Sequence, residues 1–173
     1  MALKQKIQED LKNALKEKKE LELSVFRMLS AAITNKEKIK RYKISKEKTD
    51  FTEAELEKES QLSDEEVLEA ISSELKKRKE AIVLFEEGKR MDLIEKEKAE
   101  AKILQGYLPE QLSEKELKKL AKEAIEKTGV KEIKDMGRIM AELMPKTKGK
   151  ADGSLVSKIV KELLLLKNTE KND

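Results

Sequence analysis

Apolar residues recur at every third or fourth position along most of this chain, and no other feature limits its fold as strongly. Leu3, Ile7 and Leu11 lie at helical spacing near one end, as do Ile159 and Leu163 near the other. Runs of β-branched and aromatic residues, which favour strands, do not occur. With 38% apolar and 43% charged residues the core must be thin, and bundled helices suit it because each buries one apolar stripe. We therefore predict an all-α, multihelical protein.

Three segments carry the same double signal for a helix N-terminus. Each has Ser or Thr followed three residues later by Glu, a capping box in which hydroxyl and carboxylate accept hydrogen bonds from free backbone N–H groups. Each also has apolar residues placed to form a hydrophobic staple across the cap. The pairs are Thr52 with Glu55, Ser63 with Glu66, and Ser113 with Glu116.

The segment from Gly106 to Pro109 is predicted to divide the chain into two parts. Pro109 disfavours helical geometry in the residue before it. An N-terminal helical subdomain then covers residues 1–106 and includes a polar linker near 35–62, a stretch with little to bury. A smaller C-terminal helical bundle covers residues 107–173, and its tail from Lys167 is expected to be disordered.

The chain has no Cys and no His, which removes several classes of chemistry. Thiolate and imidazole metal sites are excluded, as are disulfides and nucleophile–histidine catalysis. We identify no catalytic residue and expect no metal and no cofactor. No apolar signal segment opens the chain, and the run Leu163 to Leu166 is too short to span a bilayer. We expect a cytoplasmic location and no membrane partner.

Positive charge concentrates toward the C-terminal end. Residues 1–100 hold 23 Lys and Arg against 24 Asp and Glu, whereas residues 101–173 hold 16 against 12. A lysine-rich loop between Lys146 and Gly153, made flexible by its glycines, leads into a helix start, and both features suit phosphate. The candidate RNA-binding residues are Lys134, Arg138, Lys146, Lys148, Gly149 and Lys150.

Plainer interpretations exist for these residues. Taken alone, a lysine-rich loop beside glycines is more often a solvated connection than a binding site. Gly137 is harder to dismiss, because glycine inside a helix costs about 0.5–1 kcal/mol relative to alanine. It indicates close helix packing or close approach of a partner, and packing is the favoured interpretation of the two.

The chain resembles the YqeY-like (GatB/YqeY) family. The resemblance covers nearly the whole chain and includes Arg27-Met-Leu29, Arg90-Met-Asp-Leu93 and Tyr107-Leu-Pro-Glu-Gln-Leu-Ser113. Its most specific part is Asp135-Met-Gly137 followed by Met144-Pro-Lys146 and Lys148-Gly-Lys-Ala-Asp-Gly153. This last part is similar to the tail of the B subunit of glutamyl/aspartyl-tRNA amidotransferase. Gly137, Pro109 and Gly153 are expected to be structural residues of the motif.

The resemblance implies two helical subdomains and a tail that contacts tRNA, while the catalytic domains of the amidotransferase are missing here. Our first hypothesis is therefore a non-catalytic module that binds tRNA or other structured RNA. The second is an accessory component of a carbon–nitrogen ligase with glutamine as amido-N-donor, acting beside the tRNA amidotransferase or the aminoacyl-tRNA machinery. The third is a protein-interaction adaptor.

Overall fold

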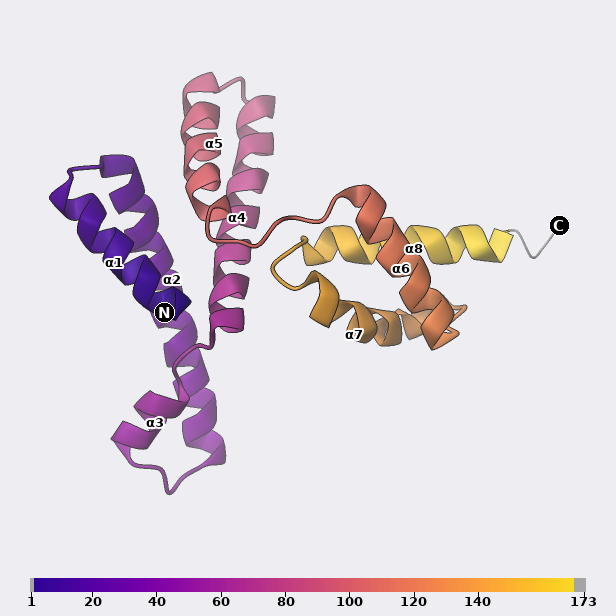
Figure 1. Cartoon of the computed structure of the whole chain (residues 1–173), viewed down its shortest axis with the longest axis horizontal. Coiled ribbons are helices and arrows are strands. Elements are labelled where there is room, and N and C mark those ends of the chain that lie inside the picture. Colours follow the sequence, from indigo (N-terminus) through magenta and orange to yellow (C-terminus); the bar gives the residue numbers. More distant parts are fainter. Residues whose placement is uncertain (1, 170–173) are drawn as a thin grey trace. The chain divides into compact units, whose positions relative to one another are not determined.

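A computed structural model describes residues 2–169 of the chain and their side chains through Leu166. Within that part every regular element is helical and no strand occurs, so the all-α prediction is confirmed (Figure 1). The elements are α1 (Leu3–Lys16), α2 (Glu20–Glu47), α3 (Glu53–Glu59), α4 (Asp64–Glu87), α5 (Met91–Gln105), α6 (Glu114–Thr128), the 3₁₀ turn η1 (Ile133–Asp135), α7 (Met136–Thr147) and α8 (Gly153–Thr169). No helix in the described range is long and apolar enough to cross a membrane.

The chain divides into two compact units, residues 1–107 and 108–173, which we call unit 1 and unit 2. In unit 1, α1 packs on α2, α4 pairs with α5, and α3 lies beside the C-terminal part of α2 (Figure 1). The unit also buries charge. The guanidinium of Arg78 pairs with Glu97 at 3.2 Å and with Glu100 at 3.1 Å, and Glu100 is only 4% exposed. The α4–α5 hairpin is therefore joined from within by an ionic contact.

Most of the expected polar linker near 35–62 is helical, which corrects the sequence prediction. All the buried residues of α2 lie between Val25 and Ile33, yet the helix continues to Glu47. Partners distant in sequence support this extension: Lys4 pairs with Glu37 at 2.6 Å and Lys40 with Glu66 at 2.8 Å. The prediction failed because such contacts leave no apolar periodicity in the sequence.

Unit 2 is a three-helix bundle in which α6 packs on both α7 and α8. Its core is formed by aliphatic side chains, with Ile139, Val160 and Leu164 fully buried. Helix α7 continues two residues past Pro145, whose missing N–H falls in the last turn. Helix α8 includes the first residues of the expected disordered tail, while residues 170–173 lie outside the described part.

The three predicted capping boxes are all confirmed. In each, the N-cap hydroxyl accepts from the N3 backbone, and the N3 carboxylate accepts from the N-cap backbone. The C-terminal ends of α1 and α4 carry a weaker signal in the sequence. Lys18 and Lys89 adopt the left-handed conformation, with φ of 55° and 53°, that glycine usually supplies after a helix. Next to Lys89, the N–H of Arg90 donates to the Phe85 carbonyl at 2.9 Å and completes a Schellman motif.

Candidate nucleic-acid interface

The candidate basic loop of unit 2 is fixed by hydrogen bonds. Gly149 is buried and has a φ of 72°, a backbone conformation that glycine adopts without strain. The Gln111 side-chain amide donates to the Gly149 carbonyl at 2.8 Å and to the Pro109 carbonyl at 2.9 Å. The Leu112 N–H donates to the Lys150 carbonyl at 2.8 Å. Gly149 therefore forms a tight turn, in contrast to the flexible loop expected from its glycines.

This bonding brings together two segments of the family motif that are distant in sequence. Gln111 and Leu112 belong to the segment before α6, while Gly149 and Lys150 belong to the loop before α8. Because Ser113 is the N-cap of α6, the Lys150 backbone lies next to the start of that helix. The role of Gln111 was missed in the sequence, where a polar residue two positions after proline gives no signal.

The predicted cations do not form one cluster. Lys134 lies in η1 and pairs with Glu132 at 2.7 Å, which raises the pKa of Lys134 through that hydrogen bond. Arg138 is exposed in the first turn of α7, and Lys146 is exposed in its last turn. Eight residues of helix separate the two by roughly 12 Å along the axis. Lys148 and exposed Lys150 lie beyond the C-terminal end of α7.

Carboxylates of the protein occupy part of this surface. Glu142, midway along α7, pairs with Lys127 of α6 at 2.6 Å and lies 4.0 Å from Lys146. The hydrogen bond from Lys127 is the main reason that the pKa of Glu142 is lowered. At the start of α8, the Asp152 carboxylate accepts from the Ser154 N–H at 2.7 Å. An anion expected at that helix start would therefore compete with Asp152.

Gly137 has a different explanation from the one favoured by sequence. It lies exposed in the first turn of α7, and a Cβ added there meets no atom within 4 Å. Close helix packing is therefore excluded as the reason for this glycine. A Cβ added at Gly153, the first residue of α8, also meets open space.

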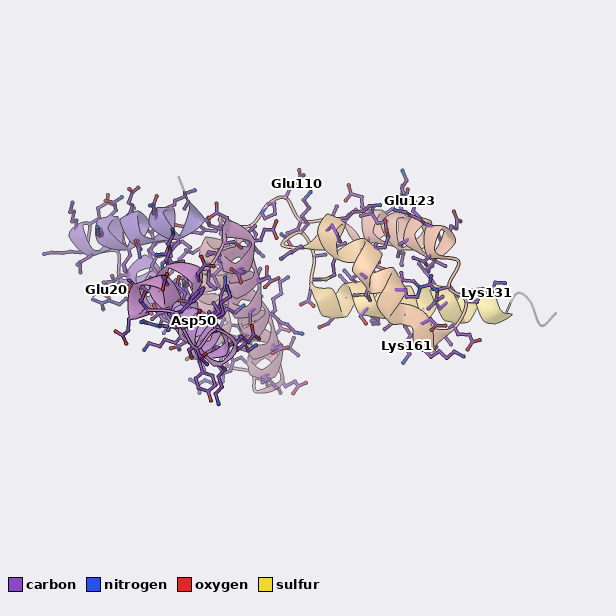
Figure 2. All side chains as sticks on the ribbon, turned by 90° about the horizontal axis from the view of Figure 1, so that it is seen from below. Glu20, Asp50, Glu110, Glu123, Lys131 and Lys161 are labelled. Carbon is purple, nitrogen blue, oxygen red and sulfur yellow. The ribbon has the colours of Figure 1, made fainter. Side chains whose placement is uncertain are left out.

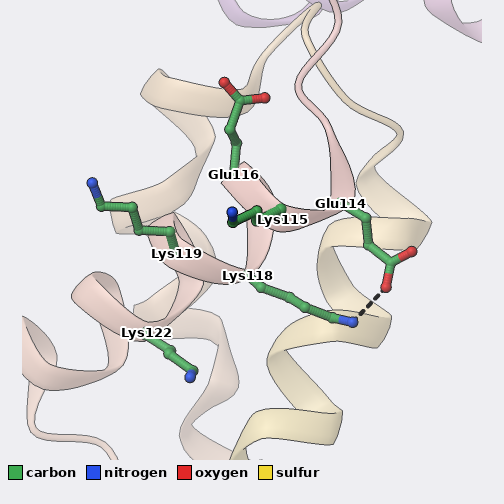
Figure 3. Close-up of a pocket in the computed structure, with 6 residues that line it drawn as sticks. All are labelled: Glu114, Lys115, Glu116, Lys118, Lys119 and Lys122. Atoms are coloured by element: carbon green, nitrogen blue, oxygen red, sulfur yellow. Dashed lines mark ion pairs between the residues drawn. The ribbon is translucent and has the colours of Figure 1, made fainter.

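A second set of cations lies on α6 and was not singled out from the sequence. Lys115, Lys119 and Lys122 recur at intervals of four and three residues, so they share one exposed face of the helix. Figure 3 shows them around an open hollow, with Lys118 directed to Glu114. That ion pair measures 2.5 Å, whereas no described carboxylate pairs with the other three lysines. The i, i+4, i+7 spacing of these lysines in the sequence could have predicted that they share a helix face.

The tyrosine before Pro109 belongs to unit 1. The Tyr107 hydroxyl donates to Asp10, and its ring meets the Phe26 ring edge-on with centroids 5.8 Å apart. Burial, and then the hydrogen bond to Asp10, raise the pKa of Tyr107 above its usual range. The phenol is thus a neutral donor, and its contacts with Asp10 and Phe26 hold it within unit 1.

Two comparisons with known proteins bear on this arrangement. A family model described as "Yqey-like protein" matches residues 35–164 of the chain. The chain is also 32% identical, over 163 residues, to "Altered inheritance of mitochondria protein 41, mitochondrial" from Pyrenophora tritici-repentis (strain Pt-1C-BFP). The similarity covers 92% of this chain and 79% of that protein.

The expected cytoplasmic location is corrected by this second comparison, because the relative is by name a mitochondrial protein. The expectation depended on the lack of an apolar signal segment at the start of the chain. Such a segment directs export, so its absence does not distinguish the cytoplasm from the interior of an organelle.

Proposed function

The chain belongs to the YqeY-like family, and we propose that unit 2 is a non-catalytic module that binds the phosphate backbone of structured RNA, with tRNA as the expected class. The observation that carries this proposal is the set of exposed, unpaired lysines on α6 beside a hydrogen-bonded basic loop. Unit 2 holds 15 Lys and Arg against 12 Asp and Glu, whereas unit 1 holds 24 of each.

Lys115, Lys119 and Lys122 supply mobile ammonium groups along one helix face, and such groups pair with phosphate oxygens irrespective of base sequence. The Ser113 hydroxyl and the Glu116 carboxylate already cap the start of α6, so the lysine side chains supply the positive charge of this face. The hydrogen bond from the Leu112 N–H to the Lys150 carbonyl keeps the basic loop next to the start of α6.

Recognition of structured RNA by shape and phosphate contacts fits the chemistry of unit 2. Double-stranded RNA is bound mainly through its backbone and 2′-hydroxyl groups, so aromatic side chains for reading bases are not required. The exposed, side-chain-free position of Gly137 suits close approach of an RNA backbone to α7. The similarity of the Lys148–Gly153 segment to the amidotransferase tail adds support, because that tail is understood to contact tRNA.

A filter-binding titration of the full chain with tRNA at several salt concentrations tests this proposal. One variant removes Lys115, Lys119 and Lys122 by alanine substitution, and a second removes Lys146, Lys148 and Lys150. The matched control replaces three exposed lysines of unit 1, Lys12, Lys16 and Lys96, and so removes the same charge.

We expect the α6 variant to weaken tRNA binding and to reduce the slope of log K against log salt by about 0.9 for each phosphate that is no longer neutralised. The loop variant should have a smaller effect, because Glu142 lies near Lys146. The control should bind as the wild type does. Equal binding by all four proteins would refute an RNA interface on unit 2.

The accessory-ligase hypothesis predicts a different result. Glutamine-dependent amide formation on charged tRNA by the chain together with a tRNA amidotransferase, and not by the amidotransferase alone, would favour it. If the chain instead recovers protein partners and no RNA from cells, the adaptor hypothesis replaces ours.

A further inference from the structure

The C-terminal half of α2, in unit 1, carries a dense set of cations that the proposal for unit 2 does not use. Between Lys36 and Lys48 the chain holds seven Lys and Arg against two Glu. The segment is helical to Glu47 and buries none of its residues. The stretch from Lys36 to Lys48, which the sequence predicted to be a polar linker, is therefore largely a helix with a positively charged face.

Three exposed lysines in the helical part of this set form no ion pair and no hydrogen bond with a described carboxylate. Lys38, Lys43 and Lys46 are exposed, and no described carboxylate lies within ion-pair distance of them. Three of the other cations have partners: Lys40 pairs with Glu66, the Arg41 guanidinium donates to the Glu53 carbonyl at 3.3 Å, and Lys48 lies over the Phe51 ring. Lys38, Lys43 and Lys46 could therefore bind phosphates without first breaking an ion pair.

An exposed aromatic ring lies among the three lysines. Tyr42 is 62% exposed, and Ile39, one turn before it, is 57% exposed. The Lys46 ammonium lies over the ring, 5.0 Å from its centroid. A base that stacks on the other face of Tyr42 would therefore have a cation nearby for its own phosphate.

Simpler explanations account for only part of this face. Cations in the last turn of a helix are stabilised by the helix dipole, which explains Lys46. The dipole effect falls off within one turn, so it explains neither Lys38 nor Tyr42. Carboxylates border the face, with Glu57 sharing a hollow with Lys38 and with Glu66 and Glu69 lining one beside Lys43. These carboxylates leave Lys38, Lys43 and Lys46 unpaired.

We propose that this face of α2, formed by Lys38, Tyr42, Lys43 and Lys46, binds a single-stranded segment of RNA. Lysines along a groove or ridge that follow the backbone, with an aromatic side chain on which a base stacks, are the usual elements of such sites. An anionic membrane fits less well, because Ile39 and Tyr42 alone do not form the continuous apolar face that interfacial helices insert. The site is distinct from unit 2, where phosphate contacts to structured RNA are proposed.

The test uses the full chain and a fluorescein-labelled oligouridine of about twelve nucleotides, followed by anisotropy at low salt. Tyr42→Ala should weaken binding by roughly five- to a hundredfold, the effect of removing one stacked base. Tyr42→Phe keeps an aromatic ring and should bind nearly as the wild type does. Because Tyr42 is largely exposed, circular dichroism should report unchanged helicity for both variants.

Charge is tested separately by replacing Lys38, Lys43 and Lys46 with alanine. The dependence of oligouridine affinity on salt should become flatter, whereas the Lys12, Lys16 and Lys96 control should keep the wild-type slope. The α6 variant of unit 2 should also bind oligouridine normally, so failure of one proposal leaves the other intact. Oligouridine affinity that is the same for wild type and Tyr42→Ala would overturn the proposal. Binding to anionic lipid vesicles with none to oligouridine would overturn it in favour of a membrane surface.

Discussion

The two units use their charged residues differently. In unit 1, local pairs occur, but several ion pairs join separate helices: Arg78 connects α4 to α5, and Lys40 connects α2 to α4. In unit 2, the pair of Lys127 with Glu142 joins α6 to α7, while Lys118 with Glu114, Lys134 with Glu132 and Lys146 with Glu142 are pairs within four positions. Charged side chains nevertheless cover the outside of both units (Figure 2).

This difference separates charge that holds the fold from charge that is available to a ligand. The core of unit 2 is aliphatic, so its surface lysines are not needed for packing. In unit 1, Lys4, Lys40 and Arg78 are paired across helices, whereas Lys38, Lys43 and Lys46 of the α2 face form no ion pair with the described residues. The net charge of the whole chain does not show which cations are paired within the fold and which are exposed without a partner.

The strongest challenge to this comparison is Arg78→Ala. The substitution leaves the buried carboxylate of Glu100 and the half-buried one of Glu97 without this partner, and we expect a loss of about 3–5 kcal/mol of unfolding free energy. The matched substitution in unit 2, Lys127→Ala, removes a largely exposed partner and should cost less than about 1 kcal/mol. Urea unfolding followed by circular dichroism measures both. Equal costs would contradict the comparison.

A second prediction concerns acid. Hydrogen bonds from Lys40 and from the Ser63 backbone lower the pKa of Glu66 below its ordinary value of 4.5. The stabilisation is therefore complete above pH 4.5 and is lost as pH falls through the lower folded value. Thermal unfolding of the wild type should show this loss between about pH 5 and pH 3.

Glu66→Gln should remove that part of the pH dependence. Glu116→Gln, the matching change in unit 2, should have a smaller effect, because Glu116 caps its helix through Ser113 without a lysine from another helix. A larger effect at Glu116 than at Glu66 would reverse the assignment of cross-helix ion pairs to unit 1.

At Gly137 we expect a gain in stability. Alanine there meets no steric obstacle, so Gly137→Ala should raise the unfolding free energy by about 0.5–1 kcal/mol. The same variant should bind tRNA less well if RNA approaches α7 at this position. Thermal unfolding and filter binding on one preparation measure both quantities. A loss of stability would restore the packing explanation.

The smallest expected effect is at Lys89. Its left-handed backbone costs a residue with a Cβ about 1–2 kcal/mol, and Lys89→Gly removes that cost. Glycine loses more entropy on folding, which offsets part of the gain, so the net increase should be about 0.5 kcal/mol. Urea unfolding is again the measurement, with Lys96→Gly inside α5 as a control that should destabilise.

Local signals in the sequence predicted much of the fold. The capping boxes at Thr52, Ser63 and Ser113 were readable because both partners lie within four residues. The C-terminal end of α2 could not be predicted from local sequence, because the helix there is held by ion pairs with Lys4 and Glu66, which are distant in sequence. The apolar period weakens after Ile33, and only the folded chain supplies the replacement contacts.

The candidate site was less predictable than the fold. Charge density along the sequence indicated Lys146 to Lys150, but it could not reveal that Asp152 binds the start of α8. Exposed lysines on α6 alternate with glutamates in the sequence, and only the helical arrangement separates them into faces. Whether a lysine is paired depends on side chains that sequence spacing does not bring together.

The graded burial of α2 has a consequence for how the protein moves. The first half of this helix is held by Val25, Phe26 and Leu29, whereas the half after Ile33 has no buried side chain. Amide hydrogens beyond residue 36 should therefore exchange with solvent through local opening, well before the rest of unit 1 unfolds. Anything that binds the distal half only when it is helical slows that opening, so a ligand on this helix would be recorded as protection of its backbone amides.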